Sequence, residues 1–444
     1  MSDNQINRLD STEVDFTRII WCDNANIIRG KAVHRSRLPA YLEHGVGISP
    51  AQQGVPASVD APVEGSGLGP VGEIRLVPDL DTLTVLPYAP GHARVMGDMV
   101  KDGKPWPLCP RDFLKRMAAM ASAMDFEVMA AFENEFYLLH LTPGELNPAD
   151  ETLFATTLSM DLQRPVIDAI AKALIDQGII VEQYYPESGH GQQEISMLYD
   201  RALTAADQQI AFRETVRAVA RQHQLKASFL PKIFADQAGS GCHLHLSLWR
   251  NGLNLTPDPE GYGQLSPLAK HFMAGILDHL PALMAVTTPS PNSYRRIRPH
   301  CWSGAFRCWG YDNREAAIRV PTHPEGPSPT NFELKTVDAA SNPYLALGIV
   351  IAAGLDGVRQ GLVLPEEVTI DPGIIPEIER LARGIDQLPT VLGKSILHLQ
   401  RDQVLLDAFG SDLAKAFLAV RRAEWETMKD WSQQMEVDLL LERY

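Results

Sequence analysis

The sequence predicts an α+β protein built from two domains. Its 444 residues are more than one compact core usually holds. Strand-like segments dominate before residue 108, whereas segments of helical period alternate with short strand-like segments after it. Several of the later strands carry charged side chains where a core strand should be apolar. We therefore predict one domain over 14–108 and a second over 109–444, which holds a mostly antiparallel sheet and the functional site.

The first domain is predicted to be mainly β structure. Residues 14–35 alternate as a hairpin whose turn lies in "CDNANIIRGK", and a short helix is expected over 36–44. The Pro/Gly-rich stretch 45–72 has almost no periodicity, which in a loop of this length indicates a function or an interface. Strand character resumes in "GEIRLVPDLDTLTVLPY" and in "HARVMGDMVKDGK".

The second domain is predicted to alternate between the two element types. Helical periodicity predicts helices over 111–125, 161–177, 203–224, 266–284, 342–361, 376–386 and 411–436. Strands are expected over 127–140, 179–184, 192–198, 226–230, 242–248, 306–309, 315–320 and 332–336.

Composition and charge exclude several classes of protein. The net charge of −15 argues against nucleic acid and anionic membranes as partners. The five cysteines are scattered without a Cys-x-x-Cys spacing, and the N-terminus lacks a secretory pattern, so a reduced, cytoplasmic protein is expected. The longest apolar run, Tyr344 to Leu355, is too short to span a membrane.

Two glutamates interrupt the strand-like segment "AAFENEFYLLH", residues 130–140. Glu133 and Glu135 are two residues apart, so on a strand their side chains point to the same face. Two carboxylates this close are costly unless a positive charge lies beside them.

Further polar side chains recur on the predicted strands. They are Glu187 and Glu194 in "ESGHGQQE", His243 and His245 in "GCHLHLSL", and Glu333 in "NFELK". An oxygen-rich set with few imidazoles suits Mg²⁺ or Mn²⁺ rather than structural zinc. Taken singly, each glutamate is equally typical of an exposed strand residue, and His245 is typical of a hydrogen-bonded core histidine.

A second group of charged residues is cationic. Residues 292–321, "NSYRRIRPHCWSGAFRCWGYDNREAAIRVP", contain Arg295, Arg296, Arg298, Arg307, Arg314 and Arg319. The planar guanidinium binds two oxygens at once, so arginines beside an acidic metal site suit a nucleoside triphosphate and a carboxylate substrate. A solvated basic patch is the alternative. The sequence contains neither a P-loop nor a convincing dinucleotide-binding motif.

The ordered motifs "ENEF", "GQQE", "GSGCHLHLS", "NSYRRIRP", "NREAAIRVP" and "FELKTVDAASNPYLAL" resemble those of the glutamine synthetase family over essentially the whole chain. The resemblance implies a small N-terminal β-grasp domain and a larger catalytic domain with a curved antiparallel sheet. It also implies a homo-oligomer of stacked hexameric rings, a dodecamer, with active sites between neighbouring subunits. ATP is then a co-substrate, and two or more Mg²⁺ or Mn²⁺ ions assist the reaction.

The resemblance also assigns roles to individual residues. One metal site matches Glu135, Glu187 and Glu194, and the second matches Glu133, His243 and Glu333. Arg296 matches the arginine that holds the α-carboxylate of L-glutamate, and Gly239 lies in the loop lining the glutamate pocket. Arg314 and Arg319 match arginines that face the ATP phosphates, and His245 and Ser247 fall in the nucleotide pocket. Glu187 is the nearest candidate for the base.

Departures from the family pattern concern the acceptor. Trp302 stands where glutamine synthetases carry a glutamate that binds ammonium, and Ser49 stands where a neighbouring subunit supplies an aspartate. Lys335 replaces an arginine, and Ala238 replaces an asparagine. We therefore expect a ligase that joins L-glutamate to a primary organic amine and forms a γ-glutamylamide. The alternatives are an ammonia-using glutamine synthetase and an inactive structural or regulatory family member.

Overall fold

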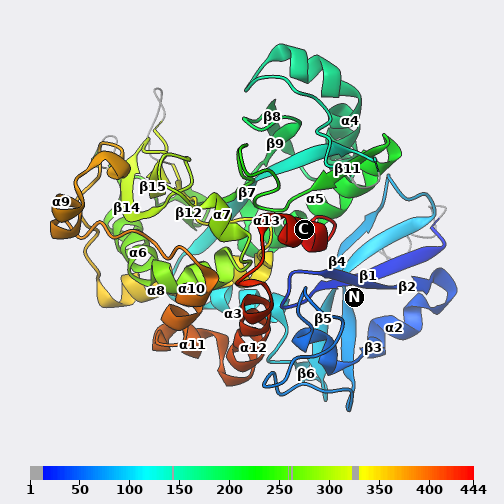
Figure 1. Ribbon diagram of the computed structural model, residues 1–444. Coiled ribbons are helices and arrows are strands. Elements are labelled where there is room, and N and C mark those ends of the chain that lie inside the picture. The colour runs from blue at the N-terminus through cyan, green and yellow to red at the C-terminus, as the bar shows by residue number, and fades with distance from the viewer. Residues whose placement is uncertain (1–13, 143–144, 259, 262–263, 323–329) are drawn as a thin grey trace.

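The computed structural model describes residues 14–142, 145–258, 260–261, 264–322 and 330–444. Residues 1–13, on which the prediction of no secretory signal rests, lie outside these ranges. An N-terminal β domain packs beside a larger α+β catalytic domain, which confirms the predicted fold class (Figure 1). Among the described residues, none of the helices combines the length and hydropathy that a membrane crossing requires.

The N-terminal sheet has the strand order β2-β1-β5-β4-β3, with β6 paired to β5. Its strands are β1 (Phe16–Cys22), β2 (Ile28–His34), β3 (Val46–Ile48), β4 (Ile74–Val85), β5 (His92–Lys101) and β6 (Lys104–Pro105). The central pair β1–β5 is parallel, and the other pairs are antiparallel. The stretch 45–72 is less irregular than predicted, because it contains β3 and the 3₁₀ turn η2 (Pro50–Gly54).

The catalytic domain is organised around a second sheet of order β14-β15-β16-β12-β7-β9-β8. These strands are β7 (Glu127–His140), β8 (Val181–Pro186), β9 (Gln192–Met197), β12 (Cys242–Arg250), β14 (Phe306–Tyr311), β15 (Ala316–Val320) and β16 (Phe332–Leu334). Short strands β10 (Asp200–Arg201) and β11 (Leu225–Ser228) pair with β7, and β13 (Leu253–Asn254) pairs with β12. Only β14–β15 is parallel among these pairs of described strands.

Helices bury the apolar side of this sheet. They are α3 (Pro110–Ala123), α4 (Thr157–Ile175), α5 (Ala202–Gln222) and α6 (Pro267–Thr287), with α8 (Pro343–Gln360) packed on α3, α5 and α6. Helices α6 and α8 cross at backbone contact. A Cβ on Gly275 would lie 2.2 Å from the Ala353 carbonyl oxygen, and one on Gly357 would lie 2.2 Å from the His271 carbonyl oxygen. Glycine is therefore required on both helices at the crossing.

The C-terminal region differs from the prediction of one helix over 411–436. It forms α12 (Ser411–Met428) and α13 (Gln433–Leu440), because Ser432 adopts an extended conformation and accepts a hydrogen bond from the Met435 N–H at 3.3 Å. The helix predicted over 376–386 is shorter, α9 (Glu377–Ala382). Periodicity did not find three further helices, α7 (Ser293–Arg296), α10 (Leu392–Leu399) and α11 (Gln403–Phe409).

Candidate active site

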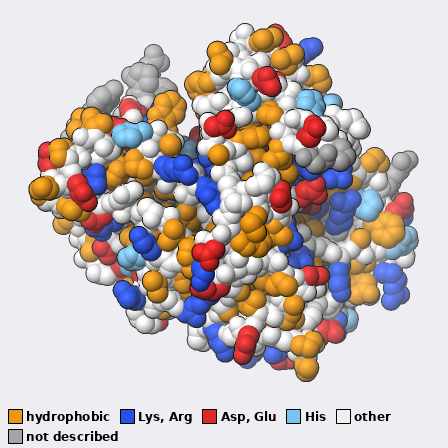
Figure 2. All heavy atoms as spheres, viewed as in Figure 1, with side chains coloured by type: hydrophobic (Ala, Val, Ile, Leu, Met, Phe, Trp, Pro, Cys, Tyr) orange, Lys and Arg blue, Asp and Glu red, His pale blue; other side chains and the backbone are white. Residues whose placement is uncertain are grey.

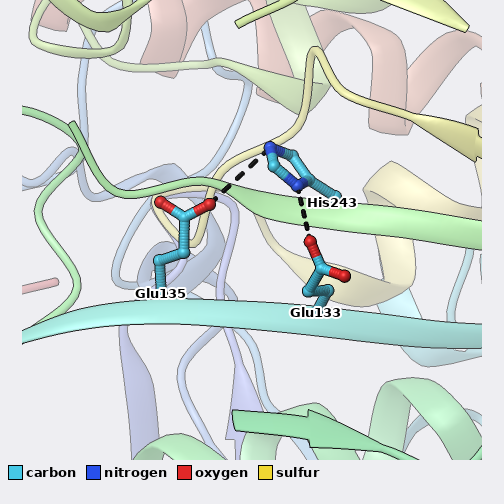
Figure 3. Close-up of side chains that lie close together, drawn as sticks. All are labelled: Glu133, Glu135 and His243. Carbon is cyan, nitrogen blue, oxygen red and sulfur yellow. Dashed lines mark hydrogen bonds and ion pairs between the residues drawn. The ribbon is translucent and has the colours of Figure 1, made fainter. Parts of the chain in front are cut away.

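Strand β7 separates its polar and apolar side chains by simple alternation. Asn134 and Phe136 point to the helical side, where they contact Gln209 and Phe212 of α5. Glu133 and Glu135 point to the opposite face, and both carboxylates extend toward His243 of β12 (Figure 3). The shared face that period-two alternation predicts is therefore present in the fold.

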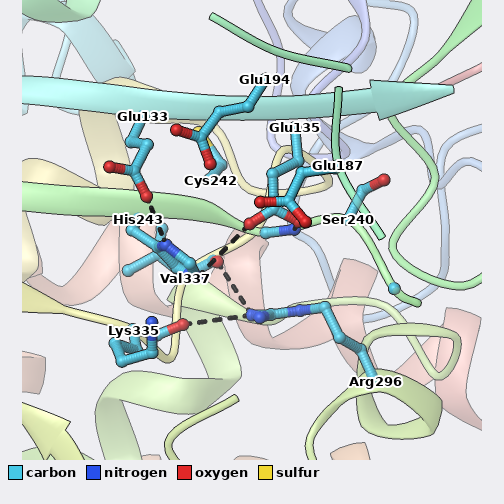
Figure 4. A network of polar contacts seen from close by, with 12 residues as sticks. Glu133, Glu135, Glu187, Glu194, Ser240, Cys242, His243, Arg296, Lys335 and Val337 are labelled. Carbon is cyan, nitrogen blue, oxygen red and sulfur yellow. Dashed lines mark hydrogen bonds and ion pairs between the residues drawn. The ribbon is translucent and has the colours of Figure 1, made fainter. Parts of the chain in front are cut away.

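Strand pairing brings the distant polar motifs into one row across the sheet. Directly paired positions are Glu135 with Glu194, Glu133 with His243, His245 with Glu333, and Arg319 with Glu333. The sheet order β15-β16-β12-β7-β9 therefore aligns the predicted site residues on one surface. Figure 4 shows the part of this row formed by Glu133, Glu135, Glu194 and His243, with Arg296 beside it.

Three carboxylates, which we call the oxygen cluster, meet on the β9 side of β7. Glu135, Glu187 and Glu194 each offer an oxygen within 4.8 Å of the other two. Each carboxylate also accepts a hydrogen bond through its Oε2: from the Gly241 N–H for Glu135 (2.9 Å), the Ser188 N–H for Glu187 (2.8 Å) and the Tyr185 hydroxyl for Glu194 (3.0 Å). These contacts hold the three carboxylates facing one another.

The oxygen cluster contacts one imidazole, since His243 Nε2 lies 3.8 Å from Glu135 Oε1. Within the described part of the chain, no lysine or arginine forms an ion pair with its three carboxylates. Burial, together with the charges of Glu133, Glu135 and Glu187, raises the pKa of Glu194 to about 10. Burial and the Glu135 charge also raise the pKa of Glu187. An all-oxygen set with uncompensated charge fits a hard divalent cation such as Mg²⁺ or Mn²⁺.

A second group, which we call the histidine cluster, occupies the β12 side of β7. His243 Nδ1 lies 2.9 Å from Glu133 Oε1 and 3.1 Å from Glu333 Oε1. His245 Nε2 lies 3.4 Å from Glu133 Oε2. The atoms of Glu133, His245 and Glu333 lie close enough together to share an ion, so His245 belongs to this cluster as well as lining the neighbouring cavity.

The protein itself supplies positive charge to the histidine cluster. Lys335 Nζ lies 3.2 Å from Glu333 Oε1, and Arg319 Nη1 lies 3.1 Å from Glu333 Oε2. Burial opposes ionisation of Glu333, but Lys335 and His243 outweigh it and hold its pKa well below the usual range. Burial alone would lower the pKa of His245, yet its hydrogen bond to Glu133 and the charge of that carboxylate raise it to about 9.

The predicted residues line two adjoining cavities. The larger, about 940 Å³, is lined by members of both clusters and by Gly239, Arg296, Trp302, Arg314 and Arg319. The smaller, about 600 Å³, is lined by His245 and Ser247. Glu133, Gln183 and Arg319 line both cavities, so the two meet at the clusters. The surface is hollowed between the region of α4 and that of β14 and β15, and basic side chains gather near this hollow (Figure 2).

Arg296 is held against the wall of the larger cavity. Its Nη2 donates to the carbonyl oxygens of Lys335 (3.2 Å) and Val337 (2.9 Å), and its buried Nε has no hydrogen-bond partner among the described residues (Figure 4). A Cβ on Gly239 would lie 2.5 Å from Arg296 Cγ and 2.7 Å from the Pro231 carbonyl oxygen. Glycine at 239 therefore allows the loop to pack directly on this arginine.

Sequence reasoning missed several residues around these cavities. Tyr185 orients Glu194, and Gln192 donates toward Glu135 (3.4 Å) and the Gly239 carbonyl oxygen (3.2 Å). Both lie within the segment "YYPESGHGQQE", so their closeness to the two glutamates was a usable signal. Ser49 caps η2 in the N-terminal domain and is not among the residues that line either cavity.

Comparison with known proteins identifies the family. The model described as "Glutamine synthetase, catalytic domain" matches residues 107–440, and the "Glutamine synthetase N-terminal domain" model matches residues 4–106. The chain belongs to the glutamine synthetase family. It is a glutamine synthetase-type, ATP-dependent ligase, and members of this family use divalent metal ions and bind glutamate, ATP and ammonia or an amine.

Individual members of the glutamine synthetase family are similar over most of their length. The chain is 40% identical to the γ-glutamylpolyamine synthetase GlnA3 of Streptomyces coelicolor, over 91% of this chain and 88% of that one. It is 32% identical to type-1 glutamine synthetase 1 of Dictyostelium discoideum, over 99% and 92%. A solved structure described as a GmaS/ADP complex has a TM-score of 0.86 at 29% identity, covering 98% of this chain and all 100% of that one.

Proposed function

We propose that this chain is a glutamate–amine ligase. It phosphorylates the γ-carboxylate of L-glutamate with ATP and transfers the resulting acyl group to a primary organic amine, giving a γ-glutamylamide, ADP and phosphate. The observation that carries this proposal is Trp302, whose side chain is 57% exposed and lines the larger cavity beside both clusters. An indole at this point offers apolar surface and a ring face for an alkylammonium group, whereas free ammonium requires carboxylates.

The segment around Trp302 uses its acidic neighbours for its own structure. The Glu315 carboxylate accepts hydrogen bonds from the Trp302 N–H at 2.7 Å and from the His300 N–H at 3.2 Å. The Asp371 carboxylate lies 2.9 Å from His300 Nδ1. These contacts hold the residues at 300 and 302, both of which have positive φ, and they leave the indole exposed to the cavity.

Two other aromatic side chains extend the apolar wall. Phe154 is 48% exposed and lines the same cavity, and its ring packs edge-on against Tyr185 with centroids 6.1 Å apart. Asp236 is exposed at the same cavity. Aromatic surface with one added carboxylate suits the carbon chain and the charge of an organic amine. The name of the Streptomyces coelicolor relative, a γ-glutamylpolyamine synthetase, supports the same substrate class.

The reaction divides between the two cavities. Arg296 holds the α-carboxylate of glutamate, while His245 and Ser247 line the nucleotide cavity and Arg314 and Arg319 orient the phosphates. The oxygen and histidine clusters would hold Mg²⁺ or Mn²⁺, which would supply the positive charge that the transferring phosphoryl group requires. The γ-carboxylate oxygen forms a bond to the γ-phosphorus as ADP leaves. The amine nitrogen then bonds to the acyl carbon, phosphate leaves, and Glu187 takes the amine proton.

The family supports a ring assembly in which each site lies between neighbouring subunits. Ser49 does not line either cavity of its own chain, and in such a ring it would face the acceptor end of a neighbouring site. We propose two stacked hexameric rings. Light scattering combined with gel filtration measures this mass directly, and a monomer that is fully active would contradict the arrangement.

Phosphate release with ATP, glutamate and a panel of amines tests the acceptor. We expect turnover with at least one organic amine to exceed turnover with ammonium. Replacing Trp302 by alanine should raise the amine KM about 3- to 30-fold, the range expected for a lost cation–π and apolar contact. Trp249→Ala is the matched control: Trp249 lines the other cavity, so its loss should not raise the amine KM. Robust turnover with ammonium and no response to any amine would identify an ordinary glutamine synthetase instead.

A further inference from the structure

Arg296 lies on a single helical turn, α7, that is too short to hold its own position. Its neighbour Arg295 points away from the carbonyls that hold Arg296 and reaches the C-terminal helix α13. There Arg295 Nε and Nη2 donate to both oxygens of Glu436, at 2.7 and 2.8 Å. Such a two-pronged contact fixes orientation as well as distance.

Glu436 has a second partner at the start of α7. Asn292 Nδ2 donates to Glu436 Oε2 at 3.0 Å, and the same side chain bonds both the N–H (2.8 Å) and the carbonyl oxygen (3.0 Å) of Lys232. Lys232 begins the loop that carries Gly239, whose backbone packs on Arg296. Gln433, also on α13, donates to the Ile233 carbonyl oxygen at 3.1 Å. Arg296, predicted to hold the glutamate α-carboxylate, and the loop of Gly239, predicted to line the glutamate pocket, are therefore both tied to α13, which lies beside α7 (Figure 1).

We propose that Glu436 is a positioning residue for glutamate binding, acting through Arg295 and Asn292 on Arg296 and on the loop of Gly239. Glu436 is 2% exposed and is not among the residues that line the cavities, so it does not touch substrate. Its buried charge is matched by Arg295. Because 141 residues separate Arg295 from Glu436, the C-terminal helix contributes to a site built mainly by earlier parts of the chain. The proposal rests on the role of Arg296 in the proposed function.

Glu436→Gln keeps the shape of the side chain but turns one acceptor oxygen into an amide donor that faces the donors of Arg295 and Asn292. We expect the KM for glutamate to rise about tenfold, the loss typical of a hydrogen bond to a charged group. The kcat and the KM for ATP should stay within about twofold, because neither cluster nor the nucleotide cavity changes. Glu436→Asp keeps the charge and should restore part of the glutamate KM.

Asp207→Asn is the matched control for a purely structural loss. Asp207 is also buried, binds Arg111 through both oxygens at 2.9 and 2.8 Å, and accepts a third hydrogen bond from the Tyr344 hydroxyl at 2.7 Å. It does not line either cavity. The two substitutions should lower the melting temperature similarly, but only Glu436→Gln should change the glutamate KM.

Arg296→Gln separates this proposal from the proposed function. If Arg296→Gln raises the glutamate KM and Glu436→Gln adds little in that background, the positioning role holds. If Arg296→Gln raises the KM but Glu436→Gln alone changes it no more than Asp207→Asn does, the positioning role is wrong and the function stands. An unchanged KM in Arg296→Gln would overturn the glutamate-binding role of Arg296 and, with it, the role of Glu436.

Discussion

The oxygen cluster and the histidine cluster lie on the same strand face but solve the problem of buried charge differently. In the oxygen cluster, Glu135, Glu187 and Glu194 face one another without an ion pair to lysine or arginine in the described ranges. In the histidine cluster, the one carboxylate of Glu333 contacts three groups: an imidazole, an ammonium and a guanidinium. A cation from solution would therefore stabilise the first cluster, whereas the second is largely neutralised by the protein.

This difference predicts that the two clusters bind metal ions with different affinities. A divalent ion at the oxygen cluster would relieve the repulsion among its three carboxylates, so we expect metal binding to raise stability there. At the histidine cluster, an added cation must compete with Lys335 and Arg319, and anionic phosphate oxygens would favour its entry. We therefore expect the oxygen cluster to hold the more tightly bound ion in the absence of nucleotide.

The largest effect is expected from removing a carboxylate that touches both clusters. Glu135 belongs to the oxygen cluster and lies 3.8 Å from His243 Nε2. Glu135→Ala should reduce ATP turnover by about a thousandfold or more, because metal ions supply several kcal/mol of charge stabilisation. Phosphate release measures this. Glu424→Gln is the control. The Glu424 carboxylate is buried, lies 2.9 Å from Arg421 Nη1, and does not line the larger cavity. An unchanged rate in Glu135→Ala would reject the metal assignment.

Glu333→Gln tests the claim that the histidine cluster is internally neutralised. The substitution leaves the Lys335 and Arg319 charges buried without their shared partner. We expect a loss of about 3 kcal/mol in unfolding free energy, as for other broken buried ion pairs. Urea unfolding in the presence of EDTA measures it. An unchanged unfolding midpoint would mean that Glu333 does not neutralise the charges of Lys335 and Arg319, and the claim would be wrong.

Glu194→Gln should act with the opposite sign in the same assay. Glu194 must take up a proton to fold without metal near pH 7, because its pKa is raised to about 10. A neutral glutamine avoids that cost and should stabilise the metal-free protein by about 1 kcal/mol, while the Tyr185 hydroxyl can still donate to the amide oxygen. Adding Mg²⁺ should stabilise this variant less than it stabilises the unchanged protein. If Glu194→Gln and Glu333→Gln both destabilise the metal-free protein, the contrast between the two clusters is wrong.

The pH dependence of metal-free stability gives a smaller and independent test. The folded-state pKa of Glu194 is raised from 4.5 to about 10, so the folded protein binds an extra proton between these values. Stability in EDTA should therefore fall as pH rises from about 5 toward 10. Thermal melts of unchanged protein and Glu194→Gln compare the slopes, and the variant should have the flatter one. Equal slopes would show that the cluster does not hold this proton.

The sequence predicted which side chains share a strand face better than it predicted how the strands pair. Alternation in "FENEF" placed Glu133 and Glu135 on one face because the period of a strand is fixed by its backbone. The pairing of Glu135 with Glu194, and of His245 with Glu333, depends on strand order and register, which short-range periodicity does not contain.

Elements without a strong repeat escaped prediction for related reasons. The division between α12 and α13 depends on the Ser432 cap, which competes with an otherwise continuous helical pattern. Helix α7 has four residues, too few for a periodic signal, yet it carries Arg295 and Arg296. Tertiary hydrogen bonds to Glu436 and to the backbone near Val337 hold it, and these come from distant parts of the chain.

The most direct test of the central claim is a competition for one activated glutamate. The protein is incubated with ATP, L-glutamate, and equal concentrations of ammonium and a panel of primary amines, and the products are measured by mass spectrometry. We predict γ-glutamylamides in at least about tenfold excess over glutamine, with one ADP formed per amide. Glutamine as the sole amide product would contradict the account, because Trp302 would then line a cavity that serves ammonium.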